Sequence, residues 1–78
     1  MDKVKKFLRT LDPKRWRRAS LVLRAIEANT LVGLDIRPLE GQKGHFRCRT
    51  GDIRFLFVRL HGQNHVYDAD FRGNIYKK

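Results

Sequence analysis

The sequence predicts an α+β domain in which a helical hairpin packs on one face of an antiparallel sheet of three strands, or of four. A change of apolar spacing along the chain and the length of the turns support this prediction. Apolar residues recur at helical spacing up to about residue 29, and from residue 45 they alternate with polar ones, as strands require. The turns between the strands are short, which makes consecutive strands antiparallel neighbours. With 78 residues, we expect one domain covering 1–78.

The first helix is expected at about residues 2–11, where an apolar stripe follows the spacing i, i+3, i+4, i+7 and comprises Val4, Phe7, Leu8 and Leu11. Asp12 and Pro13 then start a second helix at about 13–29, because Asp is a good N-cap and Pro suits the first helical position. Its expected buried side consists of Trp16, Ala19, Val22, Leu23 and Ile26.

Residues 31–41 contain Gly33, Pro38 and Gly41 and lack periodicity, which predicts a connecting loop. Three strands are expected at about 45–50, 53–60 and 65–71, with turns at Gly51-Asp52 and over 61–64. The middle strand, IRFLFVRL, is apolar on both faces after its arginine, which indicates the centre of the sheet.

The formal net charge of +10 favours phosphate-rich or acidic partners. No apolar run approaches the roughly 20 residues that cross a bilayer, so we expect no membrane segment. A lone cysteine forms no internal disulfide, which fits a reducing cytoplasm. His45, His61 and His65 lack the paired spacing of zinc motifs, so we expect no metal and no cofactor.

The stretch GHFRCRTGDIR, residues 44–54, places His45, Arg47 and Arg49 on one face of a hairpin, and Arg54 is the next candidate beyond the turn. Cys48 alternates with the arginines, which predicts a buried and unreactive thiol. These residues leave two interpretations open: a solvated basic face, or a site in which guanidinium groups bind phosphate. A guanidinium and a phenol near the chain's end could join such a site; they belong to Arg72 and Tyr76.

Several segments, in order, resemble the RelE/ParE superfamily of bacterial toxins from type II toxin–antitoxin systems. They are VKKFLRTLDPKRWRRASLVLRAIE, PLEG, HFRCRTGDIRFLF and FRGNIY, and together they cover nearly the whole chain. The resemblance implies an αα-hairpin on an antiparallel sheet, and a RelE-like activity: a ribosome-dependent, metal-independent mRNA interferase that cuts the message in the A site. Its implied partners are a cognate antitoxin, the ribosome and mRNA.

The resemblance also implies a catalytic set, which is Arg47, Arg49, Arg54, Arg72 and Tyr76. Arg54 and Arg72 would contact the scissile phosphate, while Tyr76 would stack on the nucleotide or deprotonate it. Further RNA contacts are expected from Lys43, His45, Lys77 and Lys78.

Two departures from the family pattern matter for function. RelE has lysines where this chain has Arg47 and Arg49, and arginine is a poor general base, which makes His45 a candidate substitute. The usual strand before the first helix is missing, which would expose a sheet edge to an antitoxin or a second copy. Two alternatives to the interferase stay open: a ParE-like gyrase inhibitor and an inactive RNA-binding relative. The oligomeric state is left undetermined.

Overall fold

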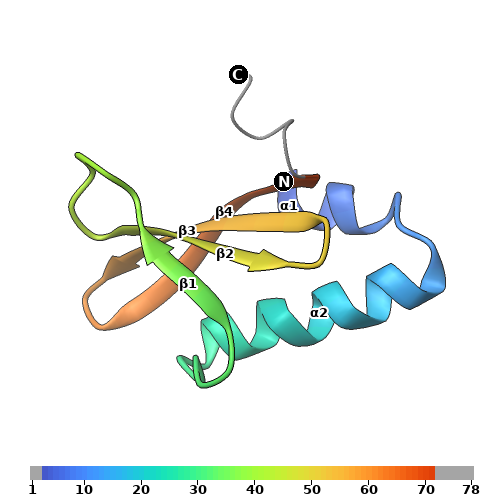
Figure 1. Ribbon diagram of the computed structural model, residues 1–78, viewed down its shortest axis with the longest axis horizontal. Coiled ribbons are helices and arrows are strands. Elements are labelled where there is room, and N and C mark those ends of the chain that lie inside the picture. Colours follow the sequence, from blue (N-terminus) through green and yellow to red (C-terminus); the bar gives the residue numbers. More distant parts are fainter. Residues whose placement is uncertain (1–2, 72–78) are drawn as a thin grey trace.

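The computed structural model describes residues 3–71, which form two helices and a four-stranded sheet (Figure 1). The helices are α1 (Lys3–Leu8) and α2 (Pro13–Glu27), and the strands are β1 (Asp35–Pro38), β2 (His45–Thr50), β3 (Ile53–Leu60) and β4 (Gln63–Phe71). The sheet order is β1-β2-β3-β4, and every neighbouring pair is antiparallel. The predicted α+β class is confirmed, with β1 as the fourth strand.

The second helix begins and ends as local chemistry dictates. The side chain of Asp12 accepts a hydrogen bond from the backbone N–H of Arg15 at 3.3 Å, and Pro13 follows as the first helical residue. At the other end Asn29 adopts a left-handed conformation with φ +58°, and its N–H bonds to the carbonyl of Ile26. A left-handed residue stops a helix because it turns the chain out of helical register. The helix is two residues shorter than expected.

Both hairpins between the long strands have two-residue turns. Gly51 and Asp52 join β2 to β3 as predicted, and His61 and Gly62 join β3 to β4 with φ values of +52° and +76°. Two consecutive positive φ values are typical of a type I′ turn, whose twist matches that of the flanking strands. The second turn is therefore shorter than the four residues expected, and β4 begins at Gln63 instead of residue 65.

The interpretation of residues 31–41 as a loop is wrong over Asp35–Pro38, which form the edge strand β1. This strand pairs with β2 from Asp35 opposite Arg49 to Pro38 opposite Phe46. Proline lacks an N–H and is tolerated at sheet edges, so Pro38 does not exclude a strand there. Four residues are too few to show a sequence period, and pairing with β2 holds them extended.

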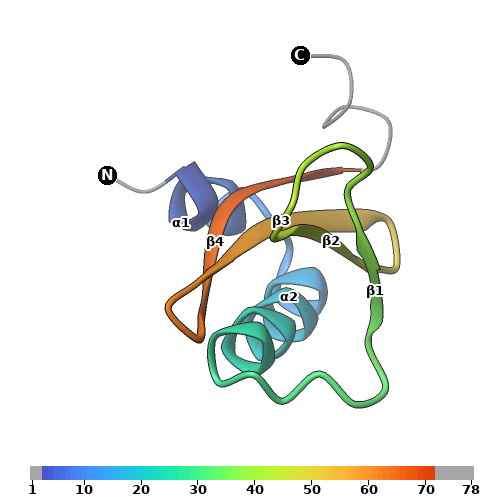
Figure 2. The ribbon, with the colours of Figure 1, turned by 90° about the vertical axis from the view of Figure 1, so that its left-hand side faces the viewer.

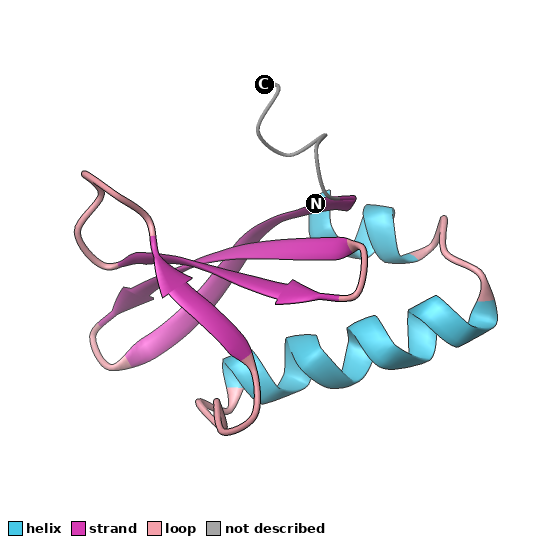
Figure 3. Ribbon diagram, viewed as in Figure 1, coloured by secondary structure: helices cyan, strands magenta, loops and turns pink. Residues whose placement is uncertain are grey.

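The two helices and the sheet enclose the core. Figure 2 shows α2 beneath the sheet and α1 beside β4, and Figure 3 shows the strands as one twisted layer. Phe7 of α1 packs edge-to-face on Phe71 of β4, with ring centroids 5.2 Å apart. The buried apolar residues are Val4, Leu8, Ala19, Val22, Ile26, Cys48, Ile53, Phe55, Phe57 and Ala69.

Trp16 departs from the predicted buried side of α2, because it is 49% exposed. Its neighbours on that stripe behave as expected, since Ala19, Val22 and Ile26 are buried. Trp16 lies in the first turn of α2 and lines a groove shared with Leu8 of α1. Because α1 lies beside β4 (Figure 2), Trp16 borders this groove and is not covered by a packed layer.

Candidate nucleic-acid interface

The side of the sheet that faces away from α2 carries four of the five predicted site residues that the structure describes, and we call it the open face. Cys48, Phe55 and Phe57 are buried toward the helices. Because side chains alternate along a strand and pair in register, the intervening residues project from the other side. The charged, histidine and tyrosine side chains that define the open face here are Asp35, Arg37, His45, Arg47, Arg49, Arg54, Tyr67 and Asp70.

One row of this face has a charged residue on each of the four strands, with two adjacent arginines flanked by two aspartates. Arg49 lies directly opposite Arg54, as the sequence predicted for the two sides of the β2–β3 hairpin. Asp35 lies opposite Arg49 on its other side, and Asp70 lies opposite Arg54. Like charges placed opposite each other weaken a sheet, and the flanking carboxylates offset this repulsion. The row therefore holds two adjacent guanidinium groups in place.

Asp35 is one of the residues of this face that sequence reasoning missed, along with Tyr67, and it fell in the stretch interpreted as a loop. Its carboxylate lies 3.3 Å from Nε of Arg49, 3.8 Å from Nε of Arg37 and 4.0 Å from Nη1 of Arg47. Three arginines thus share one carboxylate. The spacing of Asp35 and Arg37 at i, i+2 would have placed both on one face, had the strand been recognised.

Arg47 is the most enclosed of these arginines, with a side chain 16% exposed. Its Nη1 atom is buried and makes no hydrogen bond to any residue of the described chain, only the 4.0 Å ionic contact with Asp35. A buried donor without an acceptor costs free energy that a bound oxygen would recover. Arg47 therefore keeps one unsatisfied donor beneath the open face.

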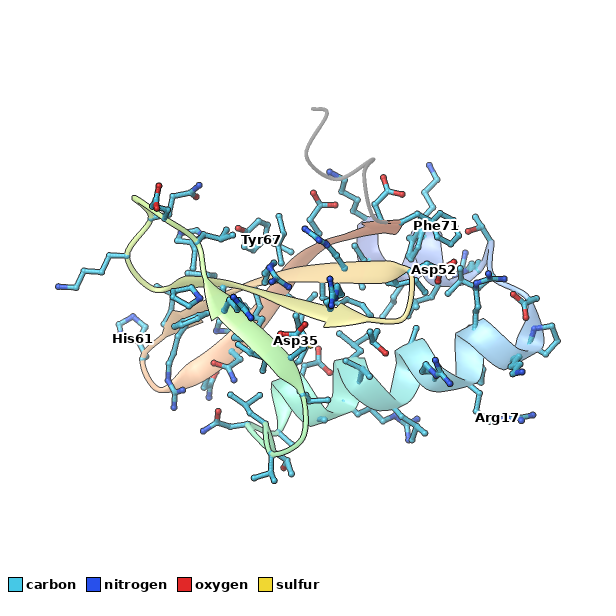
Figure 4. All side chains as sticks on the ribbon, viewed as in Figure 1. Arg17, Asp35, Asp52, His61, Tyr67 and Phe71 are labelled. Atoms are coloured by element: carbon cyan, nitrogen blue, oxygen red, sulfur yellow. The ribbon has the colours of Figure 1, made fainter. Side chains whose placement is uncertain are left out.

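His45 and Tyr67 meet at one end of the open face. Nδ1 of His45 lies 3.0 Å from the Tyr67 hydroxyl, and the rings pack edge-to-face with centroids 5.6 Å apart. A bulge in β4 aims Tyr67: Leu56 pairs with Asp68 and Phe57 pairs with Val66, which leaves Tyr67 as the extra residue. Burial, together with the charge of Asp68, raises the pKa of the Tyr67 phenol. Figure 4 shows Tyr67 on the side of the sheet away from α2.

The remaining predicted site residues, and Cys48, which was predicted to be buried and unreactive, divide into three groups. Lys43 is exposed in the segment between β1 and β2. Cys48 is buried beneath the arginines, and this burial, with the nearby Asp35, raises the pKa of its thiol to about 11. A thiol with such a pKa is a poor nucleophile at neutral pH. Arg72, Tyr76, Lys77 and Lys78 lie outside the described residues, so their roles stay predictions.

The basic residues at the start of α2 belong to a different region. Arg15 bridges two carboxylates, with Nη1 3.0 Å from Asp12 and Nη2 3.0 Å from Asp52 in the β2–β3 turn. The hydrogen bonds from Arg15 hold the pKa of both carboxyl groups below the usual range. Arg17 points away from the sheet on the far side of α2 (Figure 4). This cluster ties the hairpin to the helix and lies off the open face.

Two further properties of residues 3–71 bear on function. They contain no group of three or more His, Cys, Asp or Glu side chains placed to hold a metal ion. Neither helix described here has the length and apolar character needed to cross a membrane.

Comparison with known proteins gives one informative likeness. No protein-family model matches the chain, and no curated protein matches it in sequence. A chain from the crystal structure of the RelB–RelE antitoxin–toxin complex of Methanococcus jannaschii superposes with a TM-score of 0.75. The match covers 92% of this chain and 87% of the archaeal one at 22% sequence identity. The chain therefore has a RelE-like fold.

Proposed function

We propose that the protein is the toxin of a type II toxin–antitoxin pair and that it cleaves mRNA in the A site of the ribosome, without a metal ion. The RelE-like fold supports this proposal, since the similar structure comes from an antitoxin–toxin complex. A net charge of +10 supports a nucleic-acid target. We further propose that a cognate antitoxin binds the protein and that both act in the cytoplasm.

The observation that carries the proposal is the clustering of guanidinium groups on the open face. Arg49 and Arg54 lie directly opposite each other, and Arg47, two residues before Arg49 on β2, adds a third positive charge to the same face. Guanidinium groups bind phosphate oxygens through paired, charge-assisted hydrogen bonds. Strands hold such groups more rigidly than loops do, which suits a site that must fix a phosphodiester.

The proposed reaction is attack of a ribose 2′-hydroxyl on the adjacent phosphate. Arg54, with the predicted Arg72, contacts the scissile phosphate and offsets the charge that develops on it. Arg47 and Arg49 hold the strand and add positive charge. Tyr76 stacks on the nucleotide. A single donor aimed at a developing oxyanion contributes on the order of 10²- to 10³-fold in rate, so each arginine variant should be measurably impaired.

The test is to induce the protein in a bacterium and map the 5′ ends of translated messages. We expect new ends in register with codons, and their loss in Arg54→Ala and in Arg72→Ala with Tyr76→Phe. Arg17→Ala is the matched control, because it removes the same charge from a side chain that points away from the sheet. Absence of codon-aligned ends would refute the interferase proposal.

The same preparations separate the alternatives. Inhibition of gyrase supercoiling by the purified protein, without RNA cleavage, would assign it to the ParE-like class. Salt-sensitive RNA binding of any sequence, with neither cleavage nor toxicity, would mark an inactive relative. Co-purification with the product of a neighbouring gene would identify the antitoxin.

A further inference from the structure

The pair formed by His45 and Tyr67 has a chemistry that the arginines of the open face lack. An arginine stays charged at every physiological pH, so it stabilises negative charge but does not accept a proton. A histidine changes its charge between about pH 5 and 8. His45 and Arg47 are two residues apart on β2 and project to the same face, roughly 7 Å apart along the strand. The imidazole therefore borders the proposed phosphate site.

The contact between the two side chains fixes one ring nitrogen and leaves the other available. Nδ1 lies 3.0 Å from the Tyr67 hydroxyl, whereas Nε2 makes no hydrogen bond to any residue from 3 to 71. When the hydroxyl accepts a hydrogen bond from Nδ1–H, the neutral ring presents a lone pair at Nε2. The same hydrogen bond persists after Nε2 takes up a proton, since Nδ1 keeps its own hydrogen.

We propose that His45 accepts the proton of the ribose 2′-hydroxyl during cleavage, and that Tyr67 is the positioning residue that orients its imidazole. This assignment rests on the proposed function and names the proton acceptor of that site. It agrees with the general role of a third group that orients a catalytic base.

The step balances with water as the only co-reactant. The 2′-hydroxyl gives its proton to Nε2 of His45 as its oxygen forms a bond to phosphorus. The bond from phosphorus to the 5′-oxygen of the next nucleotide breaks, and that oxygen takes a proton from water. The products are a 2′,3′-cyclic phosphate and a 5′-hydroxyl end. The imidazolium then returns its proton to solvent.

The charged and titratable groups around His45 come from its own strand and from β1 and β4. On its own strand the nearest charged residue of this face is Arg47, and on β1 Arg37 lies opposite Arg47. On β4 the groups are Tyr67 and His65, the latter in register with His45 across Val58 on β3. Lys43 precedes the strand. Among these neighbours His65 is the other histidine, and it is exposed.

His65 therefore supplies the matched control. The assay is single-turnover cleavage of mRNA in purified ribosome complexes, measured from pH 5.5 to 8.5 with the full chain. We expect His45→Gln to lower the rate by about 10²- to 10⁴-fold, the usual range for loss of a general base. His65→Gln should leave the rate and its pH dependence unchanged. Thermal unfolding of each variant separates loss of chemistry from loss of fold.

Tyr67→Phe tests the positioning role, because it removes only the hydroxyl. We expect a rate lower by about fivefold to tenfold, as for loss of one hydrogen bond, and a displaced pH profile with an unchanged cleavage pattern. Nitrogen NMR of the imidazoles gives a readout independent of cleavage: the Nδ1–H form of His45 should predominate in the original protein and lose that predominance in Tyr67→Phe.

The outcomes are distinguishable. If the original protein cleaves no message, the proposed function fails and this inference fails with it. If it cleaves and folded His45→Gln cleaves equally well, the proton acceptor is another group and only this inference is overturned. If His45→Gln is inactive while Tyr67→Phe keeps the original pH profile and imidazole signals, the positioning role is overturned.

Discussion

Replacing Asp35 with asparagine should make the protein less stable and yet a tighter binder of RNA. The carboxylate contacts Arg49, Arg37 and Arg47 at 3.3, 3.8 and 4.0 Å. Exposed ion pairs contribute about 0.2–1 kcal/mol each, and the loss weighs more at Arg47, whose charge is largely enclosed. We therefore expect a loss of about 1–2 kcal/mol in the free energy of unfolding. For a domain of this size that lowers Tm by about 4–16 °C.

The effect on RNA has the opposite sign because Asp35 competes with phosphate for the same guanidinium groups. Freeing them should tighten binding of a single-stranded 2′-O-methyl RNA by up to about fivefold, which is an ion-pair energy of about 0.2–1 kcal/mol expressed as affinity. The slope of log K against log salt should steepen by about 0.7, the value for one extra phosphate contact on a single strand.

The control for this prediction is Asp12→Asn. It makes the same change in net charge at the start of α2, off the open face, and asparagine keeps the helix cap. Thermal unfolding and RNA titration at three salt concentrations measure both variants. Equal affinity and equal salt slope in Asp35→Asn and Asp12→Asn would show that the open face does not bind the RNA backbone.

Three further predictions concern stability and reactivity. Asn64→Ala should cost about 1–3 kcal/mol in urea unfolding, because the buried amide donates a 2.9 Å hydrogen bond to a carbonyl near the end of α2; an unchanged midpoint would contradict this. Asp12 and Asp52 have pKa values lowered below 3.8 by Arg15, so their stabilising contribution is present above about pH 4 and is lost as pH falls through the folded-state values. Arg15→Ala should therefore show a shallower loss of stability between pH 4 and 2, and an unchanged acid limb would refute the link. Cys48, with a pKa of about 11 and no exposure, should react with a thiol reagent at pH 8 only as fast as the protein unfolds; rapid labelling of the folded chain would contradict its burial.

Local chemistry accounts for the parts of the fold that the sequence predicted well. Asp12-Pro13 starts α2, and Gly51-Asp52 closes the β2–β3 hairpin. The bounds of β2 and β3 agree with the expected 45–50 and 53–60. These features depend on residues that are close together in the sequence: a helix cap, a turn or an alternating pattern. A short segment of the chain is therefore enough to predict them. The arginines of the β2–β3 hairpin were placed together for the same reason.

The features that the sequence did not show depend on residues that are distant in the chain. β1 is a strand because β2 pairs with it, and that pairing brings Asp35 to Arg49. Tyr67 on β4 reaches His45 on β2 because both strands pair with β3 and because β4 has a bulge at Tyr67. Trp16 is half exposed because α1 lies beside β4.

The sequence by itself determined the class of fold and the basic hairpin, because both follow from periodicity and turn chemistry over a few residues. Only the tertiary structure decided what surrounds the arginines: a shared carboxylate at Asp35, and a histidine held by a tyrosine. Strand pairing and a bulge bring these groups together across 14 positions of sequence for Asp35 and Arg49 and 22 for His45 and Tyr67, and no local pattern records such contacts. The predicted phosphate site of arginines thus lies on a face that also carries Asp35, which would compete with phosphate, and His45, the candidate base.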